Sequence, residues 1–315
     1  MKCASFFAGV GGIDLGFLQA GFEIIYANEI DKHAVETFKA NHNIFMDHRS
    51  ILDVPSDDIP DFDVMLAGFP CQAFSIAGYR KGFEDKGRGD LFFELERIFK
   101  DKQPSVIFLE NVKNLLSHDK GRTFEIIKNS LVENGYFIKY KVLNAFEYGN
   151  IPQNRERIYI VCFKNEEQAN KFQFPDKIPL EKNIKDMLED EKNIGKNFFY
   201  TNKTPFFYKL VDEIKNADTL YQWRRQYVRE NKNNLCPTLT ANMGTGGHNV
   251  PLLNVQGFSD TIRKLTPREC FNFQGYPKDF KLPNLSNSNL YKQAGNSVVV
   301  PVIKRIAENI ARVMK

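Results

Sequence analysis

The sequence of 315 residues contains no long apolar run and carries little net charge. A membrane-spanning helix needs about 18 or more consecutive apolar residues, and no such stretch occurs. The apolar stretch within residues 1–17 is rich in glycine, contains Asp14 and is followed by no small-residue cleavage pattern. We therefore expect it to be part of the folded protein rather than a signal peptide. With 42% hydrophobic and 26% charged residues, the composition excludes a disordered or collagen-like chain and allows about two domains.

Cysteine and histidine are few and lack the spacings of metal or disulfide sites. The five cysteines lie far apart and form no CxxC pair; they are Cys3, Cys71, Cys162, Cys236 and Cys270. The five histidines form no HxH or HExxH pattern. A disulfide framework and a zinc site are therefore disfavoured. We expect a reducing, cytoplasmic environment and metal-free chemistry.

The first half of the chain alternates strand-like and helix-like segments. Strands are predicted at residues 2–7, 22–27, 62–68, 106–109 and 158–163, and helices from the glycines after residue 8 to Gly21 and at 31–41, 91–99 and 124–131. This alternation predicts an α/β fold, a doubly wound and mostly parallel sheet. After about Phe172 the periodicity is lost, and helical spacing returns only at 298–313. We expect a sheet domain of residues 1–172 plus 290–315, and a smaller, irregular domain of residues 173–289.

The net charge of +4 conceals an uneven distribution. Residues 1–170 carry −5, residues 171–289 carry +5 and residues 290–315 carry +4. A basic stretch is in most proteins a solvated surface, but clustered arginines beside aromatics and glycines favour a polyanionic partner for the second domain.

A glycine-rich loop follows the first predicted strand. Its residues are Phe7-Ala8-Gly9-Val10-Gly11-Gly12, and Glu29 ends the second predicted strand. Glycines let backbone N–H groups approach a ligand closely, and an acidic residue at this place can accept both hydroxyls of a ribose. The pattern favours nucleotide binding over a plain tight turn. The FxGxGG spacing and the absence of a Lys-Ser/Thr end disfavour NAD and ATP.

Two reactive residue types follow neighbouring buried strands. Cys71 lies after Gly68-Phe69-Pro70, and Glu110 opens Glu110-Asn111-Val112 after the strand at 106–109. Both are expected at the carboxyl edge of the sheet, where α/β ligands bind. A lone cysteine is more often a buried structural residue, but a Pro-Cys loop favours a nucleophilic thiolate. An acid at a strand end is in isolation most often an ordinary surface charge, but a carboxyl group in a partly apolar pocket has its pKa raised and can donate a proton, which is the function expected for Glu110.

A charged run precedes the strand at 158–163. Its residues are Gln153-Asn154-Arg155-Glu156-Arg157. Alone this run is a solvated surface, but beside a cleft a guanidinium can hold a carbonyl or a carboxylate.

Together these blocks resemble the DNA cytosine-C5 methyltransferases. In size the chain is similar to the compact bacterial members of this family that belong to type II restriction-modification systems. The resemblance covers nearly the whole chain and preserves the order of the blocks: the glycine loop, Pro70-Cys71-Gln72, Arg88-Gly89-Asp90-Leu91-Phe92, Glu110-Asn111-Val112, Gln153 to Arg157, Arg268-Glu269-Cys270 with Gln274-Gly275-Tyr276-Pro277, and Gln293-Ala294-Gly295-Asn296-Ser297-Val298. It implies the fold of S-adenosylmethionine-dependent methyltransferases.

The resemblance also implies roles for four catalytic residues. Cys71 would attack C6 of a flipped-out cytosine, and Glu110 would contact N3. Arg157 would hold O2, with Arg155 supporting the site. Addition at C6 gives C5 the nucleophilic character that it needs to accept a methyl group.

The resemblance further implies a site for S-adenosylmethionine. The implied cofactor-binding residues are Phe7, Gly9, Val10, Gly11, Gly12, Asn28, Glu29, Ile30, Ser50, Ile51, Pro70, Leu91, Asn296 and Ser297. Ser50 stands where the family often has an aspartate near the adenine.

The second domain would read double-stranded DNA. The implied contacts are Gln72, Ser75, Arg224, Arg225, Arg229, Thr238, Leu239, Thr240, Gly246 and Gly247, with Lys232 adding positive charge. Thr238-Leu239-Thr240-Ala241 resembles the family's Thr-Leu element. The block at 222–251 is similar to recognition regions for short GC-rich palindromes, such as the GCNGC type.

Two other functions remain open at this point. One is methylation of cytosine C5 in tRNA, which the large arginine-bearing second domain disfavours. The other is a catalytically silent DNA-binding relative, which intact Cys71, Glu110 and Arg157 disfavour. We expect a monomer in the bacterial cytoplasm, associated with the nucleoid and in no stable complex with its restriction endonuclease.

Overall fold

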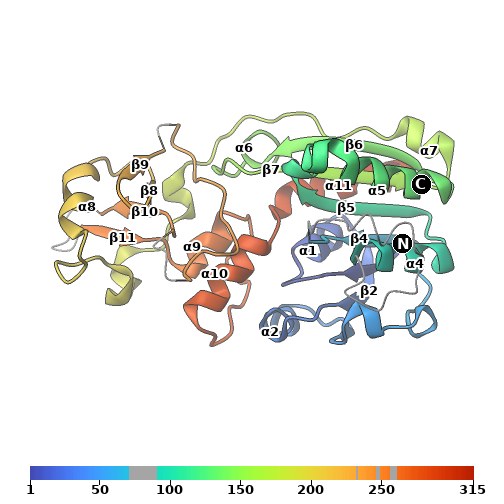
Figure 1. The fold of residues 1–315 in the computed structure, drawn as a ribbon, viewed down its shortest axis with the longest axis horizontal. Helices are drawn as coiled ribbons and strands as arrows, with labels where there is room; N and C mark the ends of the chain where they lie inside the picture. The colour runs from blue at the N-terminus through green and yellow to red at the C-terminus, as the bar shows by residue number, and fades with distance from the viewer. Residues whose placement is uncertain (71–90, 232, 246–248, 256–260) are drawn as a thin grey trace. The chain divides into compact units, whose positions relative to one another are not determined.

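The computed structural model describes residues 1–70, 91–231, 233–245, 249–255 and 261–315 (Figure 1). Packing divides the chain into two compact units. Unit 1 comprises Met1–Leu143, Glu156–Asp176 and Ile303–Lys315, and unit 2 comprises Asn144–Arg155 and Lys177–Val302.

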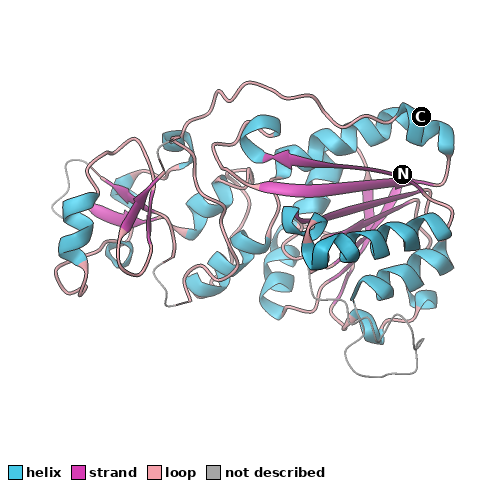
Figure 2. Cartoon of the chain, turned by 45° about the horizontal axis from the view of Figure 1, so that its top comes forward, coloured by secondary structure: helices cyan, strands magenta, loops and turns pink. Residues whose placement is uncertain are grey.

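A seven-stranded sheet forms the centre of unit 1, with strand order β3-β2-β1-β4-β5-β7-β6 (Figure 2). The strands are β1 (Lys2–Phe6), β2 (Glu23–Asn28), β3 (Met46–Asp47), β4 (Val64–Ala67), β5 (Val106–Val112), β6 (Phe137–Asn144) and β7 (Glu156–Phe163). The pairs from β3 to β5 are parallel, and β7 runs antiparallel to β5. The mostly parallel α/β sheet is therefore confirmed. The chain reverses its direction along the sheet at β1, where such folds bind ligands.

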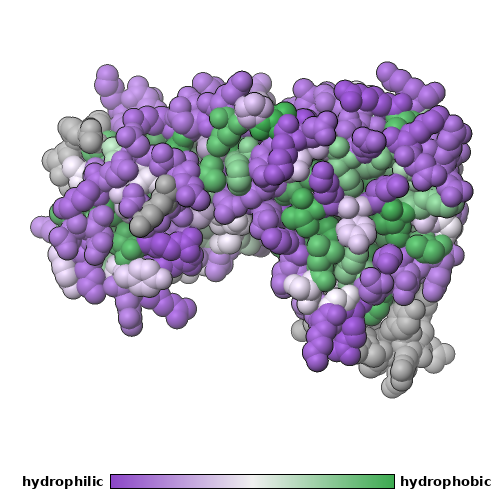
Figure 3. Space-filling view, turned by 90° about the horizontal axis from the view of Figure 1, so that it is seen from above, coloured by the Kyte–Doolittle hydropathy of each residue, from purple (hydrophilic) through white to green (hydrophobic). Residues whose placement is uncertain are grey.

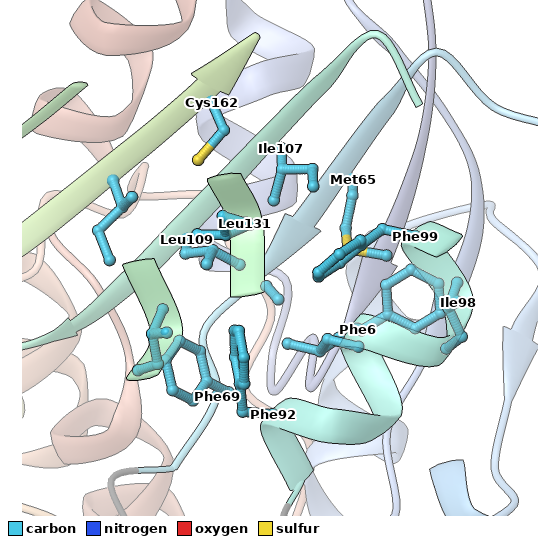
Figure 4. Close-up of a cluster of buried hydrophobic side chains, with 14 of the residues drawn as sticks. Phe6, Met65, Phe69, Phe92, Ile98, Phe99, Ile107, Leu109, Leu131 and Cys162 are labelled. Atoms are coloured by element: carbon cyan, nitrogen blue, oxygen red, sulfur yellow. The ribbon is translucent and has the colours of Figure 1, made fainter. Parts of the chain in front are cut away.

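Helices cover both faces of this sheet because its strands are apolar on both sides. The helices of unit 1 are α1 (Gly12–Gln19), α2 (Lys32–Asn41), α4 (Leu91–Lys102), α5 (Arg122–Glu133), α7 (Glu166–Lys171) and most of α11 (Val300–Val313). On one face α4 and α5 pack over a core that includes Phe92 and Leu131 (Figure 4). On the other face Phe17 of α1 stacks edge-on against Phe108, with ring centroids 5.1 Å apart.

Unit 2 contains little regular structure. Its four-stranded sheet has the order β11-β10-β8-β9, and each strand has three residues: β8 (Tyr221–Trp223), β9 (Val228–Glu230), β10 (Leu252–Asn254) and β11 (Ile262–Lys264). The helices are α6 (Ala145–Tyr148), α8 (Phe207–Glu213), α9 (Pro267–Asn272) and α10 (Asn287–Asn296). Short 3-10 turns in the two units are Ile51–Asp53, Ser56–Asp58, Lys113–Leu116, His118–Gly121, Ile184–Met187, Glu191–Asn193 and Lys196–Phe198. Phe206 stacks on Trp223 at 4.4 Å and closes a small apolar core.

The structure differs from the sequence-based expectation at two strands and at the domain limits. The strand expected at 106–109 continues to Val112 because its pairing with β7 continues as far as Arg157. Two strands, β3 and β6, were not predicted. Residues 144–155 and 290–302, grouped with the sheet by sequence, pack within unit 2. The Arg155 carbonyl accepts the Ala145 N–H, and Gln274 bonds the Ala294 carbonyl.

The described surface is mixed in character. The face in Figure 3 alternates hydrophilic and hydrophobic areas, without one uninterrupted apolar face. In the described part of the chain, no helix has the length and apolar character needed to cross a bilayer.

Candidate active site and recognition region

The glycine loop lies between β1 and α1, at the carboxyl end of a central strand. Its backbone is unusual: Phe7, Gly9 and Gly11 have positive φ angles of 54°, 58° and 85°. Gly11 is the N-cap of α1 and provides no side-chain hydrogen bond to the first turn. The N–H groups at this helix end are therefore not capped by that residue, which suits a bound ligand. A Cβ at position 11 would lie 2.3 Å from His42 Nε2, so only glycine fits.

Asn28 and Glu29, at the end of β2, hold the loops on either side of them. The Asn28 carbonyl accepts the Ala8 N–H, and its side-chain amide donates to the carbonyls of Asp47 and Arg49. The Glu29 carboxylate accepts the N–H of Gly9 and that of Asp31, each at 2.8 Å. Asn28 is 2% exposed, so its side chain serves these loops rather than a ligand.

The carboxyl ends of β2 and β3 fit a nucleoside-bearing cofactor. Glu29 is part-buried, and its oxygens retain lone pairs for ribose hydroxyls beyond the two N–H groups. Ile30 is 63% exposed and offers an apolar surface to a base. Ser50 caps a short 3-10 turn by accepting the Leu52 N–H, whereas Ile51 is buried. Ser50 therefore has its hydroxyl hydrogen available to donate to a ligand.

Glu110 and Arg157 meet between β5 and β7. Arg157 Nε lies 3.2 Å from Glu110 Oε1, and the two side chains are only 14% and 10% exposed. Gly68, at the end of β4, lies beside the carboxylate: a Cβ built there would be 3.7 Å from Glu110 Oε2, within ordinary van der Waals contact. The structure thus brings together the acid and the second arginine of the predicted site.

Asn111, the residue after Glu110, fixes the backbone at Phe69, two positions before Cys71. The side-chain amide of Asn111 donates to the Phe69 carbonyl at 2.9 Å, and both residues are buried. Several predicted site residues lie outside the described residues: Cys71, Gln72, Ser75, Lys232, Gly246 and Gly247, together with Arg88, Gly89 and Asp90. Pro70 and Leu91, which flank the first of these gaps, are described and are respectively exposed and partly exposed.

The four other cysteines are unsuited to nucleophilic attack. Cys3, Cys162, Cys236 and Cys270 are buried free thiols. Burial raises the pKa of each of them above the ordinary thiol value. Since the thiolate is the reactive form, Cys71 is the remaining candidate. No group of three or more His, Cys, Asp or Glu side chains that could hold a metal ion occurs among the residues described.

Arg155 lies in unit 2 and bonds protein carbonyls there. It is 3% exposed and donates to the carbonyls of Leu239, Gly295 and Ser297. This supports the predicted supporting role rather than contact with substrate. Asn296 is exposed at the end of α10, and the Ser297 hydroxyl bonds that of Tyr276.

A polar pocket of about 680 Å³ opens in unit 2. Arg224, Arg229, Thr238 and Thr240 line it, as the recognition hypothesis expects. Arg225 is exposed on the turn between β8 and β9 but does not line it, and the Leu239 side chain is fully buried. Leu239 does not line the pocket either, so a direct contact of its side chain with DNA is not supported.

Sequence reasoning missed the amides of this pocket. Asn154, Gln222, Asn231, Asn233, Asn242 and Asn249 also line it. Asn249 Oδ1 is buried and has no hydrogen-bond partner among the described residues. Amide side chains carry both donors and acceptors, which suits reading of base edges. Asn154 had been named only as part of the QNRER block, and the other amides lie in the block at 222–251, where the sequence marked the region but not these side chains.

The chain resembles known proteins over its full length. The family model for C-5 cytosine-specific DNA methylase matches residues 1–312. The Type II methyltransferase M.Bsp6I of Bacillus sp. (strain RFL6) is 59% identical over 100% of this chain and 99% of its own length. M.HhaI of Haemophilus parahaemolyticus is 40% identical over 98% of this chain and 94% of its own. The solved S. pombe Dnmt2 methyltransferase shares the fold, with a TM-score of 0.76 at 19% identity over 100% and 99% of the two chains. This chain belongs to the C-5 cytosine-specific DNA methylase family.

Proposed function

We propose that this methyltransferase modifies C5 of one cytosine within a short duplex site and so protects host DNA from a separately encoded restriction endonuclease. The observation that carries the proposal is the Glu110–Arg157 pair next to the strand end that leads into Cys71. The Type II relatives support the restriction-linked role.

The proposed chemistry assigns one atom of cytosine to each side chain. The Cys71 thiolate forms a bond to C6 while Glu110 protonates or hydrogen-bonds N3, and Arg157 holds O2. The electron pair delivered to the ring makes C5 nucleophilic. After C5 is methylated, loss of the C5 proton expels the thiolate and restores aromaticity. Because these atoms are inaccessible in a duplex, the base must leave the stack.

The family uses S-adenosylmethionine, and the loops at β1, β2 and β3 suit it. This cofactor supplies an electrophilic methyl group on a sulfonium and leaves as S-adenosylhomocysteine. We assign the glycine loop to its amino-acid and sulfonium end, Glu29 to its ribose, and Ile30 with Ser50 to its adenine. Asn296 and Ser297 would close over the methionine end. No step of the proposal requires a metal.

Unit 2 is proposed to read the DNA. Arg224 and Arg229 would supply phosphate and guanine contacts, and the pocket amides would contact base edges. The functional boundaries proposed from sequence give residues 173–289 to recognition and residues 1–172 plus 290–315 to catalysis. On this division the end of α10 would close over the bound cofactor. We propose a monomer, because each event methylates one strand, that works in the bacterial cytoplasm at the nucleoid.

Transfer of a labelled methyl group tests the proposal. The full chain is incubated with methyl-labelled S-adenosylmethionine and either duplex DNA from a host lacking the gene or bulk tRNA. We expect label in DNA only. Plasmid recovered from expressing cells is then digested with a panel of restriction enzymes to map the site, starting with enzymes for GCNGC.

Three results discriminate the alternatives. Label in tRNA but not in DNA would establish the tRNA reading. Absence of label from both, with DNA still bound, would establish a silent DNA-binding relative. DNA labelled at adenine would overturn the assignment to cytosine.

A further inference from the structure

The segment that precedes β7 is bonded to the Thr-Leu element along its backbone. Cys236 N–H donates to the Pro152 carbonyl at 2.7 Å, and Asn154 N–H donates to the Cys236 carbonyl at 2.8 Å. Gln153 and Cys236 form a parallel β-bridge. The Thr238 hydroxyl adds a bond to the Asn154 carbonyl at 2.6 Å. Residues 152–155 and 236–240 are therefore linked by hydrogen bonds along their backbones.

Two buried side chains hold Leu239 from both sides. Gln153 is fully buried, and its oxygen accepts the Leu239 N–H at 3.3 Å. Arg155 Nη1 donates to the Leu239 carbonyl at 2.7 Å. The N–H and the carbonyl of Leu239 are thus both bonded by side chains, those of Gln153 and Arg155, which lie two positions apart. Breaking either bond would leave buried polar atoms without partners, which is unfavourable in a site that water does not reach.

Helix α10 closes the third side of this junction. Arg155 Nη2 also donates to the carbonyls of Gly295 and Ser297, at 3.0 and 2.5 Å. A Cβ at Gly295 would lie 2.2 Å from the Thr240 carbonyl oxygen, so the helix packs directly on the element. The Gln153 amide donates to the Phe273 carbonyl at 2.6 Å. Residues 152–155, 236–240 and the end of α10 are bonded to one another, and Gln153, Arg155 and Leu239 are buried at their centre; we call this group the recognition clamp.

The recognition clamp is covalently continuous with the strand that bears the catalytic arginine. Only Glu156 separates Arg155 from Arg157, and Arg157 pairs with Glu110. Thr238 and Thr240 line the polar pocket at the other end of the clamp. A shift of the pocket wall therefore reaches the chain next to Arg157 through buried bonds rather than through a mobile loop.

We propose that Gln153 and Arg155 are positioning residues that make the rate of methyl transfer depend on the base pairs read by the Thr238–Thr240 element. This rests on the proposed function, because it takes the pocket as the site of DNA reading. A cognate site then raises the rate of chemistry in addition to the affinity. Loss of the clamp leaves an enzyme that still binds cofactor and DNA but discriminates poorly between sites.

The test compares single-turnover rates at saturating S-adenosylmethionine and duplex. One duplex carries the site mapped in cells, and the other has one base pair of that site exchanged. Arg155→Lys retains the charge but cannot span three carbonyls. Gln153→Asn retains the amide but shortens its reach. For both variants we expect the cognate rate to fall on the order of tenfold to a hundredfold. The cognate-to-exchanged rate ratio is expected to fall on the order of tenfold, with cofactor affinity retained.

Arg263→Lys is the matched control for generic loss of packing. Arg263 is also fully buried in unit 2, but it pairs with Glu191 and Glu269 outside the clamp. The Arg263→Lys substitution should lower the unfolding temperature and leave the cognate-to-exchanged rate ratio unchanged. The proposal is overturned if both clamp variants keep the wild-type ratio, or if Arg263→Lys lowers the ratio equally. Failure of the wild type to methylate any duplex would instead overturn the proposed function.

Discussion

The two units position their functional groups by different physical means. In unit 1 a continuous apolar core fixes the strands, and the chemistry lies where the strands end, as at Glu110. In unit 2 the strands have three residues each, and buried side chains such as Arg155 and Gln153 bond backbone groups directly. The first unit is held mainly by burial of apolar residues, whereas the second combines a smaller apolar core with satisfied buried polar contacts.

This difference predicts different responses to substitution. A residue at a strand end in unit 1 can change without disturbing the core, so its effect should fall on chemistry alone. A polar residue inside unit 2 holds several loops, so its effect should spread to recognition.

Glu110→Gln should remove activity without unfolding unit 1. The amide keeps the size of the carboxyl but loses its charge and its acid function at cytosine N3. We expect the single-turnover rate to fall by about 10² to 10⁴. Glu156→Gln is the control, since Glu156 forms an exposed pair with Lys113. A large rate loss in the control, or none in Glu110→Gln, would remove the distinction between the two glutamates.

Gly11→Ala should weaken cofactor binding, whereas Gly21→Ala should not. Both glycines have positive φ, so alanine costs about 1–2 kcal/mol of stability at either position. At position 11 the new methyl group also meets His42, and the loop must shift; at 21 it meets nothing within 4 Å. Calorimetric titration with S-adenosylmethionine should show a loss of affinity of about tenfold or more for Gly11→Ala only. Equal losses would show that the loop does not hold the cofactor.

Arg229→Gln should reduce the salt dependence of DNA affinity. Arg229 is exposed beside the pocket, and each phosphate contact contributes about one unit to the log–log slope of affinity against salt. We expect the slope to decrease by about one and the affinity to fall severalfold at low salt. Lys128→Gln, at a partly exposed position on α5 in unit 1, should change neither. An unchanged slope for Arg229→Gln would place phosphate binding elsewhere.

Asp14→Asn should stabilise the protein at pH 8 but not at pH 4. Asp14 is fully buried, with a Ser5 hydroxyl at 3.1 Å and Oδ1 unpartnered among the described residues, and burial raises its pKa to about 7. The folded state therefore keeps a proton that the unfolded chain loses near pH 4. Stability contributed by this group falls as the pH rises from about 4 to about 7. Thermal unfolding across this range should show a smaller decline for Asp14→Asn than for exposed Asp57→Asn.

The sequence predicted unit 1 far better than unit 2 for a physical reason. Continuous apolar runs located β1, β2, β4, β5 and β7, because a strand buried on both faces leaves a local signal in the sequence. The edge strand β6 escaped because Lys139 and Lys141 interrupt its apolar residues. The two-residue β3 is too short to produce a pattern.

The candidate site divides in the same way. Glu110, Glu29 and the glycine loop were found from their places after strands, and Arg157 from the charged run before the strand at 158–163. The sequence did not predict that Arg155 donates to the carbonyls of Leu239, Gly295 and Ser297. These partners lie 84 to 142 residues away along the chain. Such contacts depend on tertiary structure and leave no spacing in the sequence.

Covalent trapping tests the central claim most directly. A duplex that carries the mapped site with 5-fluorocytosine at the target cannot lose its C5 substituent, so the addition product persists. With S-adenosylmethionine, the wild type and Cys162→Ala should give a denaturation-resistant protein–DNA adduct, and Cys71→Ser should give none. An adduct with Cys71→Ser, or none with the wild type on a duplex that it methylates when unfluorinated, would contradict the assignment of Cys71 as the nucleophile.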